Sequence, residues 1–342
     1  MKAIVIDKFV SDFDEIKVSE IERPLPKPDQ YLIQVKAAGV NFVDTLYAKG
    51  KHQNNRSLVR PPFVLGLEFS GVVVSAPPGS VFRPGDRVFG GHTGSYSEVL
   101  SLPASMPLHR IPAGWTFAEA AGIAATLPVS YAALVLQAGI KAGQTILVHA
   151  AAGGLGIMAV QVAAALGCRV IGTAGSPEKC AVATSFGAQV CINYAEESAW
   201  WERVLALTDG KGADVVFDTV GLVDRSLKCI ARRAKILIVG FAGIQDGMER
   251  IAMNRVLLKQ ASLIGYRYGE SLRQHPEEEK IIWDGLNHLI ENNKVRPVVY
   301  GSDYSGLEQV PRALKHMTNR KIWGKAVITL DGGAADKSRA RL

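Results

Sequence analysis

The stretch that decides the fold is TILVHAAAGGLG, at residues 145–156. Its first four residues are apolar or β-branched, which predicts a short buried strand. A run of small residues and glycines follows, and the apolar segment 156–167, GIMAVQVAAALG, then predicts a helix. A strand that turns through glycines directly into a helix is typical of the first unit of a doubly wound α/β domain.

The glycines of this turn match a dinucleotide-binding template. Against G-x-G-x-x-G the positions are Ala151, Gly153 and Gly156, with Gly154 as an additional glycine. A small residue permits the tight turn, glycine lets the backbone approach a pyrophosphate, and the following helix presents free N–H groups to it. By itself the string also fits a structural turn. Its place at the first strand-to-helix junction of an α/β pattern favours a bound dinucleotide.

Outward from this turn, six short apolar runs alternate with segments that can form helices. They are TILVHA, RVIGT, QVCINY, ADVVFDTV, AKILIVGF and ASLIGYRY, all between residues 145 and 268. Continuous rather than alternating apolar strands are typical of a parallel sheet covered on both faces. We therefore predict a Rossmann domain with a six-stranded parallel sheet at residues 125–268.

Residues 2–112 show a different pattern. Short β-branched runs bounded by Pro and Gly, such as KAIVID, QYLIQVKAAGV and FVLGLEFSGVVV, predict a β-rich, barrel-like module. After two helical stretches, the last apolar run, GKAVITL at 324–330, has no nearby partner and is expected to return to this module. The predicted domains are therefore 1–124 together with 269–332, 125–268, and a flexible tail at 333–342.

The residues after the second Rossmann strand indicate which dinucleotide binds. NAD sites usually place Asp or Glu at the end of this strand for the ribose 2′-hydroxyl, but residues 172–179 read GTAGSPEK, with no acid at the strand end. Ser176 can donate to a 2′-phosphate and Lys179 can neutralise it, which favours NADPH. Ser176 is also a good helix N-cap with Pro177 at the first helical position, and the two roles are compatible.

The chain shows no pattern for a catalytic metal or a nucleophile. A catalytic zinc needs three Cys, His or carboxylate ligands, whereas the β-rich module has no cysteine and its histidines are His52, His92 and His109. The four cysteines of the chain form no C-x-x-C pair and are expected to be free thiols in a reducing compartment. No G-x-S-x-G elbow occurs. We therefore expect the cofactor itself to be the reactive group, with no metal bound.

Charge and hydropathy restrict the partners. The net charge is +7, but the 39 Lys and Arg are scattered among 32 acids without a basic-aromatic stripe, and this argues against a nucleic-acid partner. The apolar runs are shorter than a membrane-spanning helix requires, and no signal-peptide pattern occurs, which predicts a cytoplasmic protein. The tripeptide Ala340, Arg341, Leu342 resembles the S-K-L peroxisomal address, with a frayed basic tail as the alternative.

Six strings distributed over nearly the whole chain match a known family. They are AAGVNFVD (37–44), PFVLGLEFSGVV (62–73), PGDRV (84–88), HAAAGGLG (149–156), INY (192–194) and GKAVITL (324–330). With them the sequence resembles the zinc-free quinone oxidoreductases, the zeta-crystallin-like branch of the medium-chain dehydrogenase/reductase superfamily. The resemblance implies a GroES-like catalytic domain beside the Rossmann domain, a homodimer, and NADPH-dependent hydride transfer to quinones or α,β-unsaturated carbonyl compounds.

The resemblance also explains the missing metal ligands. In zinc alcohol dehydrogenases, which share the fold, a cysteine lies near the position of Asn41 and a histidine lies at the position of Leu67, beside Glu68. Both ligands are replaced in this chain, and Glu68 is interpreted as a structural carboxylate.

Roles for individual residues follow from the same resemblance. The catalytic candidates are Asn41, Asp44 and Tyr47, with Asn41 at the nicotinamide end of the cofactor site. The candidates for the pyrophosphate are Ala152, Gly153, Gly154 and Leu155, and those for the 2′-phosphate are Gly175, Ser176, Lys179, Tyr194 and Arg320. Gly221 and Phe241, with residues 265–268, would line the rest of the cofactor and the substrate mouth. The family often has a cofactor-binding threonine before the first Rossmann strand, and the candidates for it here are Thr126 and Ser130. From the residues alone, Tyr194 could equally be a core aromatic and Arg320 a solvated cation.

Two other functions stay open from the sequence. An enoyl-thioester reductase would need cations at the mouth of its cleft, and Lys51 and Arg267 could serve. The non-enzymatic alternative is an NADPH-loaded binding or structural protein, including one that binds RNA. The lack of a basic-aromatic stripe argues against it.

Overall fold

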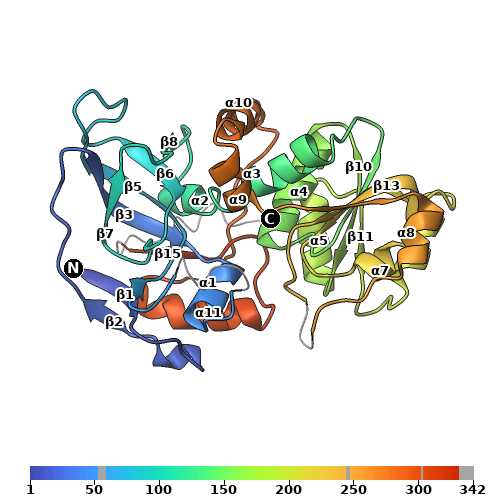
Figure 1. Cartoon of the computed structure of the whole chain (residues 1–342), viewed down its shortest axis with the longest axis horizontal. Coiled ribbons are helices and arrows are strands. Elements are labelled where there is room, and N and C mark those ends of the chain that lie inside the picture. Colours follow the sequence, from blue (N-terminus) through green and yellow to red (C-terminus); the bar gives the residue numbers. More distant parts are fainter. Residues whose placement is uncertain (53–58, 244–246, 302, 331–342) are drawn as a thin grey trace. The chain divides into compact units, whose positions relative to one another are not determined.

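The computed structural model describes residues 1–52, 59–243, 247–301 and 303–330, and it divides into two compact units (Figure 1). Unit 1 consists of Met1–Ala125 together with the chain from Pro297 onward. Unit 2 is Thr126–Arg296. The two expected kinds of domain, one rich in β-strands and one of the α/β class, are both present.

Unit 1 is built on antiparallel strands. One sheet has the order β15-β3-β5-β6-β8, with β7 also pairing with β3, and a smaller sheet has the order β2-β1-β4. As the sequence predicts, the last strand returns to this unit: β15 pairs with β3, with Val327 opposite Gly39. The strands are β1 (Lys2–Ile6), β2 (Val18–Glu20), β3 (Gln30–Gly39), β4 (Phe63–Val64), β5 (Glu68–Ser75), β6 (Arg87–Gly91), β7 (Val99–Pro103), β8 (His109–Arg110) and β15 (Val327–Thr329).

Three helices and two single turns complete the described part of unit 1. Helix α1 begins directly after β3 and packs against α11, so that the N-terminus of α1 lies next to the main sheet. Helix α2 contacts β3 and β5. The bounds are α1 (Phe42–Ala48), α2 (Phe117–Ala121) and α11 (Val310–Thr318), with 3-10 turns at Phe13–Glu15 and Leu307–Gln309.

Unit 2 contains the predicted six-stranded parallel sheet. Its order is β11-β10-β9-β12-β13-β14, which is 3-2-1-4-5-6 in the order of the chain. The strand order reverses between β9 and β12, and ligands of such sheets bind outside the carboxyl ends of the strands at this point. The strands are β9 (Thr145–Val148), β10 (Arg169–Ala174), β11 (Val190–Asn193), β12 (Ala213–Asp218), β13 (Ile230–Ile238) and β14 (Ser262–Gly265).

Helices connect these strands, and the buried residues of α4 are apolar or glycine apart from Gln161. All four residues of β9 are buried, and α4 contacts both β9 and β10. The helices are α3 (Leu127–Tyr131), which continues into a π-helical turn at Ala132–Gln137, then α4 (Gly154–Ala165), α5 (Pro177–Ser185), α6 (Trp200–Leu207), α7 (Val223–Ser226), α8 (Met253–Lys259), α9 (Tyr268–Gln274) and α10 (Glu278–Glu291).

The second boundary between the units lies at Arg296, later in the chain than the expected 268. Helix α10 stays with unit 2 because it packs against α3. A Cβ on Gly285 would come within 2.0 Å of the hydroxyl oxygen of Tyr131, so glycine is required for this contact. Gln161 then holds the end of the segment, because its side chain exchanges hydrogen bonds of 3.1 and 3.0 Å with the backbone of Arg296.

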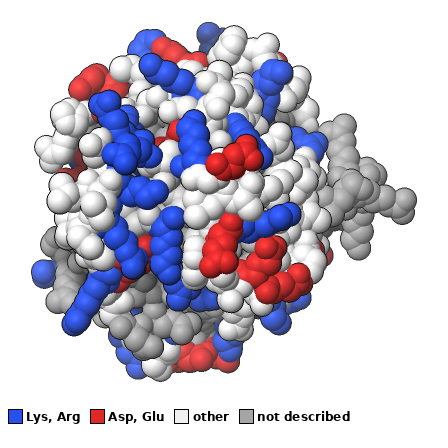
Figure 2. All heavy atoms as spheres, turned by 90° about the vertical axis from the view of Figure 1, so that its right-hand side faces the viewer, with Lys and Arg blue, Asp and Glu red and all other residues white. Residues whose placement is uncertain are grey.

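The surface of unit 2 is positively charged on one side. Figure 2 shows many Lys and Arg side chains on the face at the right of Figure 1, with several Asp and Glu among them. Arg232 and Arg233 are exposed cations of this unit, at a register shift between β12 and β13 where Arg233 has a φ of 64°. Lys228 lies 4.0 Å from the centre of the Trp201 ring.

Within the described ranges no helix combines the length and the apolar character needed to cross a membrane. The predicted tail at 333–342, with the tripeptide Ala340, Arg341, Leu342, lies outside the described residues. The peroxisomal interpretation of that tripeptide therefore stays a prediction.

Candidate functional site

The turn between β9 and α4 is shaped by backbone contacts that leave no room for side chains. Ala150 has a φ of 49°, and its carbonyl accepts the N–H of Gly153 at 2.8 Å. A Cβ on Gly156 would lie 2.1 Å from that carbonyl oxygen. A Cβ on Gly172, in the neighbouring strand β10, would lie 2.7 Å from the Cβ of Ala151. Glycine at 156 and 172 is therefore a steric requirement of this turn.

The first turn of α4 presents backbone N–H groups, which is a chemistry suited to an anion. The N-cap residue is Gly153, which has no side chain to accept the N–H groups of the first turn. The first helical hydrogen bond runs from the N–H of Ile157 to the carbonyl of Gly153, at 2.8 Å. The N–H groups of Gly154, Leu155 and Gly156 are thus donors at the positive end of a twelve-residue helix.

Two buried side chains support this turn from within unit 2. Ser130 is fully buried, and its hydroxyl donates to the carbonyl of Leu155 at 2.9 Å. His149 is fully buried as well, with Nδ1 2.9 Å from the hydroxyl of Thr173 and Nε2 2.9 Å from that of Ser226. Burial lowers the pKa of His149, which keeps the ring neutral. No role was predicted for His149, although a polar residue at the end of a buried strand is a usable signal.

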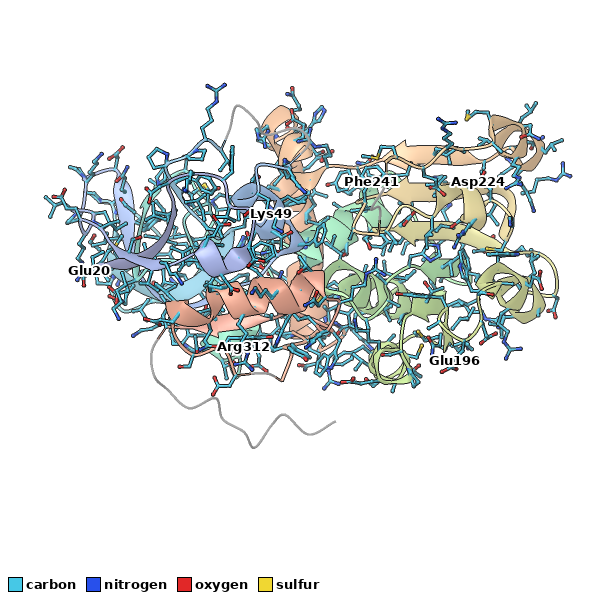
Figure 3. The ribbon with its side chains drawn as sticks, turned by 90° about the horizontal axis from the view of Figure 1, so that it is seen from below. Glu20, Lys49, Glu196, Asp224, Phe241 and Arg312 are labelled. Atoms are coloured by element: carbon cyan, nitrogen blue, oxygen red, sulfur yellow. The ribbon has the colours of Figure 1, made fainter. Side chains whose placement is uncertain are left out.

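Asp218 holds the loop after β12 in the same way. Its buried carboxylate accepts the N–H groups of Val220, Gly221 and Leu222 at 2.7, 2.9 and 2.6 Å. This fixes Gly221, whose φ is 95°, at the carboxyl end of the sheet. Phe241, labelled in Figure 3, follows β13 and is 41% exposed. Asp218 was not among the predicted residues, and its signal is an acid between an apolar strand and a glycine turn.

The candidates for the 2′-phosphate in unit 2 lie after β10 and β11. Tyr194 lies directly on Gly175, because a Cβ there would come within 2.5 Å of the tyrosine hydroxyl oxygen. Ser176 is the N-cap of α5, as predicted, and its hydroxyl accepts the N–H of Lys179 at 3.3 Å. Tyr194 is 39% exposed, so it is not a buried core aromatic. Arg320 belongs to unit 1, and its contact with this group stays a prediction.

In unit 1, Asn41 lies in a buried polar cluster at the N-terminus of α1. Its Nδ2 donates to Oε1 of Glu68 at 2.9 Å, and its Oδ1 accepts from Nζ of Lys325 at 2.6 Å. The other oxygen of Glu68 accepts the N–H of Ala125 at 2.8 Å. Lys325 was not among the predicted site residues, although it lies inside the family string GKAVITL.

Asp44, the third residue of α1 after the N-cap Asn41, is fully buried. Its Oδ2 accepts the backbone N–H of Asn41 at 2.8 Å and the hydroxyl of Tyr96 at 2.6 Å. Its Oδ1 has no hydrogen-bond partner among the described residues. Burial raises the pKa of Asp44 to about 7, so this carboxyl retains a proton up to neutral pH. In unit 1 it holds the start of α1, and its catalytic role stays a prediction.

Tyr47 lines a cavity of about 430 Å³ within unit 1. The ring of Tyr47 stacks on that of His52, with centroids 4.9 Å apart and an interplanar angle of 28°. Mostly apolar walls with a few polar groups are typical of sites for small, largely apolar molecules. The lining residues are Phe9, Leu46, Tyr47, Gly50, His52, Val59, Arg60 and Pro61.

The structure thus divides the predicted site residues between the two units. Asn41 and Asp44 are in direct contact, and Tyr47 lies on the same helix. The turn 152–155, Ser130, and the group from Gly175 to Tyr194 belong to unit 2. The expectation that both sets meet around one cofactor is a proposal.

The described residues do not form a metal site. No three His, Cys, Asp or Glu side chains within the described ranges are grouped so that they could hold an ion. In the cluster around Asn41, the ammonium of Lys325 already lies 2.6 Å from Glu68. Among the described residues this cluster therefore offers a zinc ion a lysine ammonium in place of a third ligand, and the metal-free reaction stays a proposal.

Two family models match the chain. The alcohol dehydrogenase GroES-like domain matches residues 27–113, and the zinc-binding dehydrogenase domain matches residues 154–284. The quinone oxidoreductase-like protein 2 homolog of Nematostella vectensis is 33% identical over 329 residues, which cover 92% of this chain and 88% of that protein. The quinone oxidoreductase of Homo sapiens is 31% identical over 318 residues, covering 91% and 92%.

Solved structures agree with these relatives. The crystal structure of Escherichia coli quinone oxidoreductase complexed with NADPH matches with a TM-score of 0.84 and 29% identity, over 96% of this chain and 100% of that one. The GroES-like and Rossmann architecture predicted from the sequence is confirmed. Sequence relatives, domain matches and fold lead to the same assignment: the chain belongs to the medium-chain dehydrogenase/reductase family, in its quinone oxidoreductase branch, and is an oxidoreductase.

Proposed function

We propose that this protein is an NADPH-dependent reductase that transfers a hydride to quinones or other α,β-unsaturated carbonyl compounds without a bound metal ion. The observation that carries the proposal is the N-terminus of α4, behind a turn where a Cβ on Gly156 would lie 2.1 Å from a backbone oxygen. At the reversal point of a 3-2-1-4-5-6 sheet, such a helix end binds a pyrophosphate. The NADPH in the crystal structure of the Escherichia coli relative supports the choice of dinucleotide.

The residues after β10 support a 2′-phosphorylated cofactor. The hydroxyl oxygen of Ser176 accepts from the N–H of Lys179, and the hydroxyl hydrogen is left to donate to a phosphate. The ammonium of Lys179 supplies charge, and the hydroxyl of Tyr194, over Gly175, supplies a further donor. Arg320 is proposed as an additional cation from unit 1. No acid at the end of β10 opposes the phosphate.

When bound, NADPH supplies the hydride. Asn41 is proposed to orient the nicotinamide, and the cavity lined by Tyr47 is proposed to bind the acceptor. A quinone needs no strong acid, because its reduction leaves a stabilised oxyanion. An enone needs a proton at carbon, for which the hydroxyl of Tyr47 or a water molecule is the proposed source.

Oxidation of NADPH, followed separately with a panel of quinones and a panel of enones, tests the reaction. Activity with either panel is the expected result, and a silent enzyme with both would contradict the proposal. Competition by coenzyme A in the same assay detects an enoyl-thioester reductase. A chelator is expected to leave the rate unchanged, and loss of activity that zinc restores would contradict the metal-free reaction.

A binding function for nucleic acid remains the non-enzymatic alternative. The Lys and Arg side chains on the face in Figure 2 are the feature that would favour it, but acids interrupt them. We therefore expect no shift of RNA in a gel assay at physiological salt. A shift that weakens steeply with added salt would support the alternative.

The proposal includes a homodimer formed through the sheet edge of unit 2. Among the described strands, β14 is hydrogen-bonded on one side only, to β13. Helix α8, directly before it, has no buried residue, and Met253, Leu257 and Leu258 are 65, 76 and 69% exposed. A second copy would present the same strand edge and the same apolar helix, and an isologous contact would cover both.

A further inference from the structure

A buried ion pair contacts the side chain of Asn41 in unit 1. Nζ of Lys325 is 2.6 Å from Oε1 of Glu68, with side-chain exposures of 4% and 0%. Two residues from distant parts of the sequence thus meet in the interior. Moving two ions out of water costs more free energy than their mutual attraction returns, unless further hydrogen bonds satisfy them. A buried ion pair therefore calls for a structural or functional explanation.

The backbone around the pair leaves space for it. A Cβ on Gly39 would lie 2.5 Å from Oε1 of Glu68 and 2.4 Å from the carbonyl of Ala121. A Cβ on Gly122 would lie 2.8 Å from Cγ of Lys325. Glycines on two separate elements therefore make room for the two partners, and the site is built to hold both charges.

The consequence of the pair is the orientation of the Asn41 carboxamide. Lys325 donates to Oδ1 of Asn41 at 2.6 Å, and Oε1 of Glu68 accepts from Nδ2 at 2.9 Å. An ammonium can only donate and a carboxylate can only accept, so these two neighbours distinguish the two ends of the amide. A rotation of the amide by 180° would set donor against donor and acceptor against acceptor.

The surrounding groups keep this arrangement in place. Asp44 and Tyr96 hold the backbone of Asn41 through the bonds to Oδ2, and the N–H of Ala125 holds the second oxygen of Glu68. The carbonyl of Gly39 accepts from Nδ2 of Asn41 at 3.4 Å, a weak contact at the limit of hydrogen-bond distance. The other contacts do not touch the amide, so the ion pair is what selects the orientation.

We propose that Lys325 is a positioning residue of the reductase: with Glu68 as its counter-ion, it holds the carboxamide of Asn41 in one orientation toward the bound nicotinamide. The inference rests on the proposed function, which gives Asn41 that role. Lys325 acts through Asn41 and does not itself touch the reacting atoms.

The test compares Lys325→Met, Glu68→Gln and the double variant. Each single variant leaves one buried charge without its counter-ion and is expected to lower Tm. In the double variant neither position 325 nor position 68 carries a charge. The glutamine introduced by Glu68→Gln keeps the bond from Ala125 through its oxygen, and its NH₂ group then faces Asn41, which favours the rotated amide.

We expect the double variant to regain most of the lost Tm, but to have a kcat lower by about tenfold or more, as for a misplaced reacting group. KM for the quinone and Kd for NADPH should stay near the values of the unsubstituted enzyme. The variant Lys325→Arg keeps the cation and its donors and is expected to retain most of kcat. A double variant that regains both Tm and kcat would overturn the inference. The ion pair would then affect only stability, and Lys325 would have no part in positioning Asn41.

A control and an independent measurement complete the test. Tyr304→Phe removes a part-buried hydrogen bond to His316 in the same unit, at 2.8 Å, and should lower Tm without changing kcat. In a ¹⁵N spectrum of the NADPH-bound protein, the side-chain NH₂ of Asn41, assigned through Asn41→Asp, should be protected from exchange. Rapid exchange would overturn the inference even if the double variant did not fold. If the unsubstituted protein oxidises NADPH with none of the quinones or enones, the proposed function fails, and the ¹⁵N spectrum alone tests the inference about Asn41.

Discussion

The hydroxyl of Tyr96 donates to Oδ2 of Asp44 at 2.6 Å, and both side chains are fully buried. The second oxygen of Asp44 has no partner among the described residues and can carry a proton. Burial raises the pKa of this carboxyl from its ordinary 3.8 to about 7. Between these two pH values, the folded protein holds a proton that the unfolded chain releases. The stabilisation from Asp44 is therefore complete at low pH and is lost as pH rises toward 7.

Asp44→Asn is expected to remove this pH dependence, because an amide does not ionise. The Tm of the unsubstituted protein should fall relative to that of the variant as pH rises to about 7. Above pH 7 the difference between the two Tm values should stay constant. The slope cannot exceed about 1.4 kcal/mol of stability per pH unit for one proton. Calorimetric melts in a series of buffers measure it. Parallel curves over the whole range would show that Asp44 is ionised in the folded state.

Gly156→Ala is expected to weaken both unit 2 and cofactor binding. The added methyl group would lie 2.1 Å from the carbonyl oxygen of Ala150, so the turn has to move. Overpacking of this kind costs about 1–3 kcal/mol of stability. Melting curves and NADPH titrations measure the two effects. Gly301→Ala is the matched control, because a Cβ there meets no atom within 4 Å, and an equal loss in both variants would contradict the steric argument.

Lys179→Met tests the preference for the 2′-phosphate. Loss of a charged hydrogen bond costs roughly 1.5–3 kcal/mol, so the affinity for NADPH should fall roughly 10- to 100-fold while that for NADH is nearly unchanged. Calorimetric titration with each nucleotide measures the ratio. Lys211→Met serves as control, since Lys211 lies before β12, at the opposite end of the sheet from the turn. An equal loss for both nucleotides would place Lys179 away from the 2′-phosphate.

Leu257→Glu with Leu258→Glu tests the homodimer. Charges on the exposed face of α8 should separate the subunits, because a buried carboxylate without a partner is costly. The mass measured by light scattering is expected to fall from that of two chains to that of one. Val81→Glu changes a valine of unit 1 that is also 76% exposed, and it should leave the dimer intact. A dimer that survives the α8 substitutions would place the interface elsewhere.

Local patterns account for the features that the sequence predicted well. The strand 145–148, the glycine turn and the following helix are neighbours in the chain, and so are Ser176 and the helix that it caps. Their conformations depend on hydrogen bonds between residues a few positions apart and on the period of the apolar side chains. Such interactions can be predicted from residues that are close together in the sequence.

Long-range packing decided what the sequence left open. The boundary at Arg296 depends on Gly285 meeting Tyr131, and the partner that orients Asn41 is Lys325, 284 residues further along the chain. The roles of His149 and Asp218 also appeared only when their loops were folded against the sheet. The sequence by itself determined the fold class, the family and the glycine turn between β9 and α4, because these follow from local periodicity and short motifs. Only the tertiary structure decided which buried charges face each other, because pairing between distant segments depends on how the strands and helices pack.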